Sequence, residues 1–161
     1  MKTIDMEIAI ADYFNSRVNL IVPNISYGMG LHECDLLIIT KSNYAYEVEI
    51  KVSSADLIRD IKKKHNHEHE KIKHLYFAIP SYLTEFTRYI PERAGIIVVD
   101  NQVADSGIWQ GCCKRIREAK INSKYRFTDT EIFNVARLGT MRIWTLKQKL
   151  REYEKDRRVC Q

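Results

Sequence analysis

Apolar and polar positions alternate most clearly between residues 35 and 52, where β-branched and aromatic residues are frequent. Residues 36–39 are all apolar, and residues 44–52 change in side-chain character with a period of two. This pattern predicts two β-strands. The residues between them suit a hairpin loop, because Asn43 can adopt the left-handed conformation that closes a short loop. The segment therefore predicts an antiparallel hairpin centred on Ser42.

This centre determines which residues share a face, since opposed residues of an antiparallel pair lie on the same side of the sheet. Asp35 is predicted to lie directly across from Glu49. One face is apolar and is expected to pack on helices; it carries Leu36, Ile38, Tyr44, Tyr46, Val48, Ile50 and Val52. The other face carries Asp35, Leu37, Ile39, Glu47, Glu49 and Lys51.

Carboxylates gather on this second face, at the end remote from the loop. Opposed side chains stand about 5 Å apart at Cβ, and like charges at that distance are unfavourable unless a cation joins them. A hard divalent cation such as Mg²⁺ or Mn²⁺ prefers carboxylate oxygens and water as ligands. Asp35 and Glu49 are therefore predicted to bind a metal ion.

The spacing of these residues resembles a nuclease motif. Asp35, followed after thirteen residues by Glu49-Ile50-Lys51 on an α-β-β-β-α-β pattern, resembles the PD-(D/E)XK nuclease superfamily. The sequence Lys-Val-Ser-Ser at 51–54, followed by a basic helix that contains aspartate, is similar to the MmcB-like DNA-repair branch of that superfamily. The resemblance covers about the first hundred residues. Cys34 stands where the family name has proline.

The resemblance implies a restriction-endonuclease-like α/β core, with a mixed sheet flanked by helices. It also implies a Mg²⁺- or Mn²⁺-dependent DNA endonuclease that hydrolyses phosphodiester bonds in DNA repair or processing. In this interpretation Asp35, Glu49 and the backbone carbonyl of Ile50 bind the metal ion, while Lys51 orients the attacking water and stabilises charge.

Two further acidic residues have two interpretations each. Glu7 lies in the first turn of the first predicted helix, where it completes the metal site, as the resemblance implies, or only stabilises the positive helix end. Glu47 either holds an outer-shell water or faces solvent.

The remaining pattern predicts strands that alternate with helices, which is typical of a mixed α/β sheet. We expect helices over residues 5–15 and 82–89, an edge strand over 20–27 interrupted by Pro23, a strand over 73–79, a central strand over 94–99 and an edge strand over 113–117. Asp5 is the predicted cap of the first helix. Residues 100–111 are predicted to be rich in turns.

The basic helix after the motif is predicted to begin near Ser53 and to bury Leu57, Ile58 and Ile61. Its basic residues either contact DNA phosphates or form a solvated face. The predicted DNA contacts are Ser53, Arg59, Lys62, Lys63 and Lys64. The histidines that follow, His65, His67 and His69, suggest a zinc site, but we favour a solvated polar turn because no second ligand cluster of fixed spacing accompanies them.

The charge balance fits a polyanionic partner such as DNA. Lysine and arginine outnumber aspartate and glutamate by 26 to 21, which gives a net charge of +5 and a pI near 9.0. No signal-peptide pattern and no apolar run long enough to span a bilayer is present, so we expect a cytoplasmic protein with no membrane partner. The 4 cysteines contain no C-x-x-C pair, which argues against a disulfide scaffold or a zinc knuckle.

The C-terminal part of the chain predicts one long helix. Thr128-Asp129-Thr130-Glu131 matches a capping box, and the helix is expected to run to about Asp156. Packing on its own domain is the default, with homodimerisation through this helix or DNA clamping as alternatives. We therefore divide the chain into a nuclease-like core, residues 1–120, and a segment with the long helix, residues 121–161. One stripe of this helix is apolar and consists of Ile132, Val135, Ile143, Leu146, Leu150 and Tyr153.

Two other functional classes fit the same residues. A non-catalytic nucleic-acid-binding protein can retain the fold, because a fold does not establish an activity. An interaction protein of phage or mobile-element origin would carry the acidic hairpin as a salt-bridged surface and make its contacts through the long helix. The motif would then be a simple ion cluster of Asp35, Glu49 and Lys51. Metal-dependent DNA cleavage separates the endonuclease from both alternatives.

Overall fold

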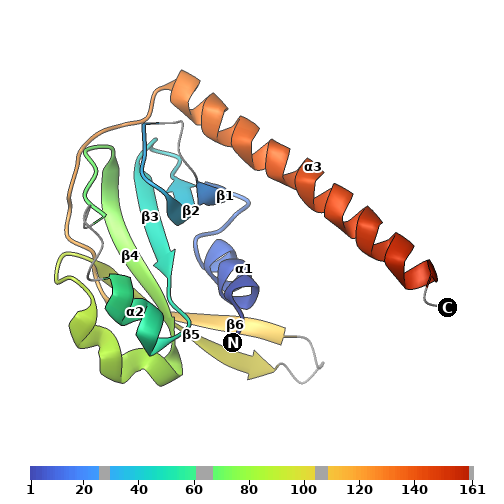
Figure 1. Ribbon diagram of the computed structural model, residues 1–161. Coiled ribbons are helices and arrows are strands. Elements are labelled where there is room, and N and C mark those ends of the chain that lie inside the picture. The colour runs from blue at the N-terminus through green and yellow to red at the C-terminus, as the bar shows by residue number, and fades with distance from the viewer. Residues whose placement is uncertain (26–29, 61–66, 104–108, 160–161) are drawn as a thin grey trace.

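The computed structural model describes residues 1–25, 30–60, 67–103 and 109–159. Helices cover both faces of one sheet (Figure 1). In chain order the elements are α1 (Thr3–Tyr13), β1 (Leu20–Ile25), β2 (Cys34–Ile39), β3 (Ala45–Ile50), α2 (Ser54–Asp60), β4 (Ile72–Pro80), the 3-10 helix η1 (Ser81–Tyr89), β5 (Gly95–Val103), β6 (Trp109–Arg117) and α3 (Asp129–Val159).

The sheet is mixed and has 6 strands in the order β1-β2-β3-β4-β5-β6. β3, β4 and β5 run parallel to one another, whereas the β1–β2, β2–β3 and β5–β6 pairs are antiparallel. The predicted α/β class, with helices on the sheet and a long C-terminal helix, is confirmed. The first six elements follow one another as helix, three strands, helix and strand.

The β2–β3 hairpin has the predicted register. Leu36 pairs with Val48 and Ile39 with Ala45, so the hairpin is centred on Ser42. Asn43 has a φ of 62°, the left-handed conformation expected for it. The loop closes with a hydrogen bond of 2.9 Å from the Thr40 N–H to the Tyr44 carbonyl.

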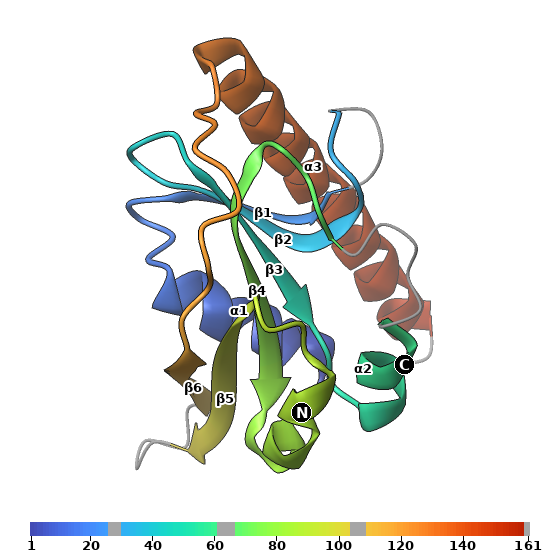
Figure 2. The same ribbon diagram turned by 90° about the vertical axis from the view of Figure 1, so that its left-hand side faces the viewer.

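The two faces of the sheet carry separate parts of the core. On one face, Leu36, Ile38, Val48 and Ile50 pack with residues of α1, as the apolar face of the hairpin predicted. On the other face, Leu57 of α2 packs with side chains of β4, η1 and β5. The first half of α3 covers the part of this second face that is built from β1 and β2. Figure 2 shows α1 and α2 on opposite sides of the strands.

Three local predictions are wrong. Asp5 does not cap α1 from outside; the helix begins at Thr3, and the Asp5 carboxylate accepts the Lys2 N–H at 2.9 Å from within the first turn. Residues 100–103 and 109–111 are strand and not turn, because β5 continues to Val103 and pairs with β6; residues 104–108 lie outside the described residues. Ile58 is 38% exposed, whereas Asp60, which follows Leu57 by three positions, occupies the buried face of α2; Ile61 lies outside the described residues.

The capping box at the start of α3 is confirmed. The Glu131 N–H donates to the Thr128 hydroxyl at 3.3 Å, and the Thr128 N–H donates to the Glu131 carboxylate at 2.8 Å. Lys71 also forms an ion pair of 2.8 Å with Glu131, which ties the helix start to the segment before β4.

Only the first half of α3 packs on the chain's own sheet. Val135 is fully buried, and a Cβ at Gly139 would stand 3.2 Å from Val22 of β1. Arg142 donates to the carbonyl of Asn24. Beyond this point the helix projects away from the sheet (Figure 1), and its apolar stripe is 54% to 64% exposed at Ile143, Leu146, Leu150 and Tyr153. No helix in the described part of the chain combines the length and apolar character needed to cross a bilayer.

Candidate active site

The candidate site lies along the second half of β3, where Glu47, Glu49 and Lys51 point to the same face of the sheet. They do so because alternate residues of a strand share a face. Their exposed fractions are 0%, 2% and 4%, so this polar row is buried. The prediction that Glu47 holds an outer-shell water or faces solvent did not anticipate this burial. Buried ionic groups require partners, and the neighbouring elements supply them.

Asp35 joins the start of β2 to the end of β3. Its carboxylate accepts the backbone N–H of Ile50 at 2.7 Å. Burial raises the pKa of Glu49 and so does the nearby Asp35 carboxylate, although the Lys51 ammonium opposes the shift. The predicted metal ligands Asp35, Glu49 and Ile50 therefore lie near one another at one end of the hairpin, although the contact with Ile50 is through its N–H.

Glu7 approaches the same place from α1. Burial and the Asp35 carboxylate raise the pKa of Glu7, and a hydrogen bond with the side chain of Asn24 partly offsets this. Glu7, Asp35 and Glu49 thus form a chain of like charges in which Asp35 is the middle member.

Lys51 is held between two carboxylates. Its ammonium lies 2.8 Å from Glu49 and 3.0 Å from Asp60, the last residue of α2. Burial acts to lower the pKa of Lys51, but the two carboxylates outweigh it and raise the pKa above its usual range. Lys51 therefore stays charged at every physiological pH.

His67 lies at the centre of a buried network and not in a solvated turn, so the favoured interpretation of the histidine run is wrong at this position. The side chain is 2% exposed. Its Nδ1 lies 2.8 Å from Glu47 and its Nε2 lies 2.8 Å from Asp60. Burial acts to lower the pKa of His67, but the hydrogen bonds to Asp60 and Glu47 raise it to about 9. His65 lies outside the described residues, and the Nδ1 of His69 accepts the backbone N–H of Lys71.

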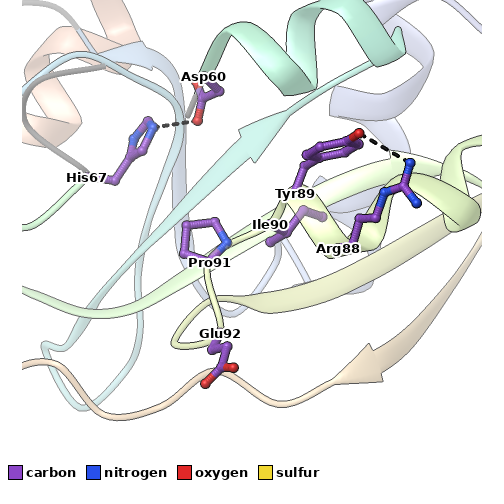
Figure 3. Close-up of a pocket in the computed structure, with 7 residues that line it drawn as sticks. All are labelled: Asp60, His67, Arg88, Tyr89, Ile90, Pro91 and Glu92. Atoms are coloured by element: carbon purple, nitrogen blue, oxygen red, sulfur yellow. Dashed lines mark hydrogen bonds and ion pairs between the residues drawn. The ribbon is translucent and has the colours of Figure 1, made fainter. Parts of the chain in front are cut away.

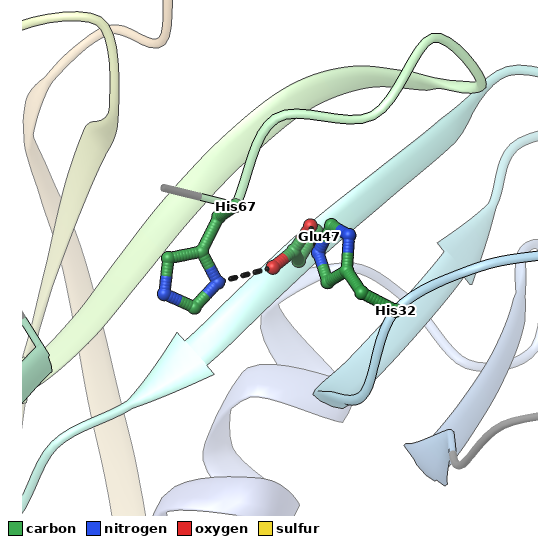
Figure 4. A group of neighbouring side chains, drawn as sticks. All are labelled: His32, Glu47 and His67. Atoms are coloured by element: carbon green, nitrogen blue, oxygen red, sulfur yellow. Dashed lines mark hydrogen bonds and ion pairs between the residues drawn. The ribbon is translucent and has the colours of Figure 1, made fainter. Parts of the chain in front are cut away.

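His32 completes the network from the segment before β2. Its Nε2 lies 2.7 Å from the second oxygen of Glu47, so one imidazole contacts each oxygen of this carboxylate (Figure 4). Burial acts to raise the pKa of Glu47, but the hydrogen bonds with His32 and His67 outweigh it and lower the pKa. Glu47 is therefore ionised.

Two groups of potential metal ligands lie in this network. They were found among the described residues, and the donor atoms of each group are within 4.8 Å of one another. Asp35 and Glu7 belong to neither group. The predicted acids lie side by side, but they do not converge on one point as these two groups do. The groups are His32–Glu47–His67 and Glu49–Asp60–His67.

A pocket of about 350 Å³ opens beside Asp60 and His67. Figure 3 shows these two residues on one side and the residues at the end of η1, Arg88 and Tyr89, on the other. The Arg88 guanidinium donates to the Tyr89 hydroxyl at 3.2 Å. The buried network therefore has one wall that faces a space lined by a cation and an aromatic ring.

The predicted DNA-binding residues divide into three cases. Ser53 caps α2, because its hydroxyl accepts the Asp56 N–H at 3.2 Å and its carbonyl accepts the Leu57 N–H at 3.1 Å. Arg59 is exposed on α2. Lys62, Lys63 and Lys64 lie outside the described residues.

Sequence reasoning missed Asp60, and it gave His32 no role. A signal for Asp60 was present, since it follows the apolar Leu57 by three positions and so falls on the same helix face. Nothing in the local pattern around His32 distinguishes it from an ordinary loop histidine. Its partner Glu47 is 15 positions away and is reached only through the β1–β2–β3 arrangement.

Cys34, at the position of the family proline, is buried beside the acidic residues. Burial and the carboxylates of Glu47, Glu49 and Asp35 raise the pKa of its thiol far above the usual range. Cys34 is therefore a neutral core residue and not a nucleophile.

Comparison with known proteins identifies a shared fold. No model of a known protein family matches the sequence, and no curated protein matches it. The structure is similar to that of the SPO1766 protein of unknown function from Silicibacter pomeroyi, with a TM-score of 0.60 and 16% sequence identity over 92% of this chain and 90% of that chain. At this identity the similarity extends to the fold alone, so the chain is an α/β protein that shares its fold with SPO1766.

Proposed function

We propose that this protein is a metal-dependent DNA endonuclease of the PD-(D/E)XK type that acts in DNA repair or processing. The observation that carries the proposal is the grouping of Asp35, Glu49 and Lys51 where β2 begins and β3 ends: Asp35 accepts the Ile50 N–H, and Lys51 lies 2.8 Å from Glu49. These residues have the types, order and strand positions of the nuclease motif that the sequence resembles.

The residues at this point fit a divalent cation. Burial raises the pKa of both Glu49 and Glu7, and the Asp35 carboxylate adds to this, so three carboxylates repel one another and favour a positive charge between them. Their donor atoms are all oxygen, which Mg²⁺ and Mn²⁺ prefer. In a strand the N–H and C=O of one residue point to the same neighbour. Since the Ile50 N–H points to Asp35, the Ile50 carbonyl is directed to the same side and supplies the third ligand.

The chain's own residues then have separate tasks. Asp35, Glu49 and the Ile50 carbonyl would hold the ion, with Glu7 behind Asp35. The bound ion supplies a polarised phosphoryl oxygen and a more acidic water. Lys51 supplies a fixed positive charge beside Glu49 for the negative charge that develops at the phosphorus centre. Asp60 keeps the Lys51 ammonium in place.

Nucleic acid is the proposed partner because the chain is basic and a lysine run follows α2 in the sequence. Arg59 is exposed on α2, and Lys62 to Lys64 follow it in the sequence. Phosphate contacts from such side chains supply affinity without reading the base sequence. We place the activity in the cytoplasm, because Cys34, Cys112 and Cys113 are free thiols, which persist in a reducing compartment.

The test is incubation of the protein with duplex, flapped, mismatched and branched DNA, with Mg²⁺, with Mn²⁺ and with EDTA. We expect metal-dependent cleavage of at least one substrate. Lys51→Ala should lower the rate by about 10²- to 10³-fold and leave Mg²⁺ affinity unchanged, because an ammonium is not a metal ligand. Glu49→Gln should lower both the rate and the Mg²⁺ affinity.

Lys71→Ala is the matched control, since Lys71 also pairs with a glutamate at 2.8 Å but lies at the start of α3. It should cleave like the wild type. The proposal fails if no substrate is cut with either metal ion, or if Lys51→Ala and Lys71→Ala cleave equally well.

A non-catalytic nucleic-acid-binding protein is the second candidate. One observation favours it: Glu49 and Lys51 are only 2% and 4% exposed, and Lys51 is held by two carboxylates, so the motif is closed to solvent in this structure. This candidate predicts salt-dependent DNA binding that neither Mg²⁺ nor Lys51→Ala changes.

A further inference from the structure

The cluster formed by His32, Glu47 and His67 lies beside the oxygen-donor site at Asp35 and Glu49, and its three residues include neither of those ligands. Its three side chains come from three separate segments: the residues before β2, the middle of β3, and the segment between α2 and β4 (Figure 4). Two imidazoles and one carboxylate are the ligand set that zinc-type ions prefer, because imidazole nitrogen binds borderline-soft ions better than it binds Mg²⁺.

The donor atoms of this cluster already face one another. His32 Nε2 lies 2.7 Å from one Glu47 oxygen, and His67 Nδ1 lies 2.8 Å from the other. All ligand atoms are within 4.8 Å of one another. Zinc binds nitrogen and oxygen at about 2.0 to 2.2 Å, so ligand atoms spaced in this way reach one ion through small side-chain rotations.

A further donor is close to the same point. Glu49 Oε1 lies 3.7 Å from His67 Nδ1. Since structural zinc sites are four-coordinate, Glu49 or a water supplies the fourth position.

The orientation of His67 matches that of a metal-bound histidine. Its Nδ1 faces Glu47 while its Nε2 lies 2.8 Å from the Asp60 carboxylate. Metal-bound histidines commonly donate their other ring N–H to a carboxylate, which sets the tautomer and the ring orientation. Asp60 is itself held by Lys51 at 3.0 Å, so this outer contact is also fixed.

The buried carboxylates of this region can balance the charge of a bound cation when His67 gives up its proton to serve as a ligand. Glu47 has no exposed surface, and Glu49 and Asp60 are 2% and 9% exposed. The Lys51 ammonium contacts Glu49 and Asp60, while the imidazoles of His32 and His67 contact Glu47. His32 is the least buried ligand, with 14% side-chain exposure, and lies on the side from which an ion can enter.

We propose that His32, Glu47 and His67 form a binding site for a zinc-type divalent transition-metal ion, with Glu49 or a water as the fourth ligand. The ion joins His67 to β3 and so positions Asp60, which holds Lys51. The proposal stands on the geometry of the cluster and does not depend on nuclease activity.

The experiment is titration of the EDTA-treated full-length chain with Zn²⁺ by calorimetry, and with Co²⁺ by visible absorption. We expect one equivalent of Zn²⁺ to bind and Co²⁺ to give the absorption bands of a site with nitrogen and oxygen ligands. His32→Ala should weaken binding by more than about 100-fold, beyond the range typical of an outer-shell partner. Glu47→Gln should have a similar effect, and Asp60→Asn should weaken binding by about 10- to 100-fold.

Two variants serve as controls. His74→Ala removes a half-buried histidine of β4 that packs on Tyr46 on the opposite face of the sheet, and it should bind Zn²⁺ like the wild type. Asp35→Asn, which alters the oxygen-donor site, should also retain Zn²⁺.

The wild-type titration tests the proposal even if a variant fails to fold. Absence of stoichiometric Zn²⁺ and Co²⁺ binding by the wild type overturns the proposal and leaves the cluster as a hydrogen-bonded ionic network. A Zn²⁺ affinity of His32→Ala equal to that of the wild type also overturns the proposal. If Asp35→Asn loses Zn²⁺ while His32→Ala retains it, the ion belongs to the oxygen-donor site. Absence of DNA cleavage has no bearing on it.

Discussion

Lys51 and Asp60 form an ion pair of 3.0 Å that joins the residue after β3 to the last residue of α2, with side-chain exposures of 5% and 6%. Asp60 is also 2.8 Å from His67. One carboxylate thus connects the lysine of the nuclease-like motif to the histidine of the proposed zinc site. The position of Lys51 therefore depends on α2 and on the segment around His67, not on its own strand alone.

Replacement of Lys51 is expected to destabilise the fold as well as to lower any activity. Lys51→Met leaves Glu49 and Asp60 buried without their ammonium, so the free energy of unfolding should fall by about 3 to 5 kcal/mol. Lys71→Met removes a lysine from a more exposed pair, 22% exposed on each side, and should cost no more than about 1 kcal/mol. Urea denaturation at pH 7 measures both values. Equal losses would contradict the strong coupling of Lys51 to its two carboxylates.

Neutralising Asp35 tests the oxygen-donor site without a substrate. In EDTA, Asp35→Asn should unfold at or above the wild-type temperature, because it removes a like-charge interaction worth roughly 0.2 to 1 kcal/mol while the asparagine oxygen still accepts the Ile50 N–H. In Mg²⁺ at 100 times its Kd, the wild type should gain about 2.7 kcal/mol and the variant much less. Melting curves in both conditions give the answer.

Glu33→Gln is the control for this measurement, since Glu33 is exposed and lies two positions before Asp35. It should behave like the wild type in both conditions. A less stable Asp35→Asn in EDTA, with no Mg²⁺ gain in either protein, would leave a simple ion cluster.

DNA affinity tests the basic segment that begins on α2. Two variants are compared with the wild type: Arg59→Ala, and a triple variant in which Lys62, Lys63 and Lys64 are changed to alanine. Both should weaken DNA binding and reduce its salt dependence. The slope of log affinity against log salt concentration should become shallower by about 0.9 for each DNA phosphate that is no longer neutralised. Lys41→Ala is the control, because Lys41 is exposed in the hairpin loop at the other end of β3. Fluorescence anisotropy over a range of salt concentrations measures the slopes. Slopes equal to that of the wild type would show that this segment lies away from the DNA.

Glu131 should stabilise the start of α3 in a pH-dependent way. Burial acts to raise its pKa, but Lys71, Thr128 and Tyr125 outweigh it and lower the pKa to about 2. The folded-state pKa is depressed, so the contribution is present above the unfolded value of 4.5 and is lost as pH falls towards 2. Glu131→Ala should therefore cost about 1 to 2 kcal/mol at pH 7 and clearly less at pH 3.

Chemical denaturation at the two pH values measures this difference. Glu152→Ala, at an exposed position of the same helix, should change stability by less than about 0.5 kcal/mol at both. A cost for Glu131→Ala that does not change with pH would show that the carboxylate charge contributes nothing.

The projecting half of α3 is expected to pair with a second copy of the chain. Ile143, Leu146, Leu150 and Tyr153 repeat at alternating spacings of three and four, as in the seam of a coiled coil. Lys147 and Glu154 flank this seam at equivalent positions, so in an antiparallel helix pair each would face a residue of opposite charge. Leu146→Glu and Leu150→Glu should convert the dimer to a monomer in sedimentation equilibrium.

Trp144→Glu is the matched control for the dimer. Trp144 is 60% exposed but lies off the seam, so its replacement should leave the dimer intact. A wild-type chain that stays monomeric at all concentrations, or equal effects of the three variants, would contradict pairing through the seam.

The sequence by itself determined the features that depend on short-range chemistry. The period-two pattern and Asn43 predicted the β2–β3 hairpin in its correct register, because a one-residue slip would turn every apolar side chain to the wrong face. The residues from Thr128 to Glu131 predicted the start of α3, because a capping box is completed within one helical turn. Pro23 predicted the edge strand, since proline cannot donate to a neighbouring strand.

Only the tertiary structure decided which polar residues are buried together. Glu47 and His67 are 20 positions apart and meet because the chain crosses over through α2 before β4 pairs in parallel with β3. A buried glutamate and an exposed one have the same strand period, so the pattern around Glu47 could not distinguish them. The same holds for α3, where the apolar stripe continues at helical spacing but the sheet ends beneath it. Burial is set by which distant segments pack against a face, and the local sequence does not contain that information.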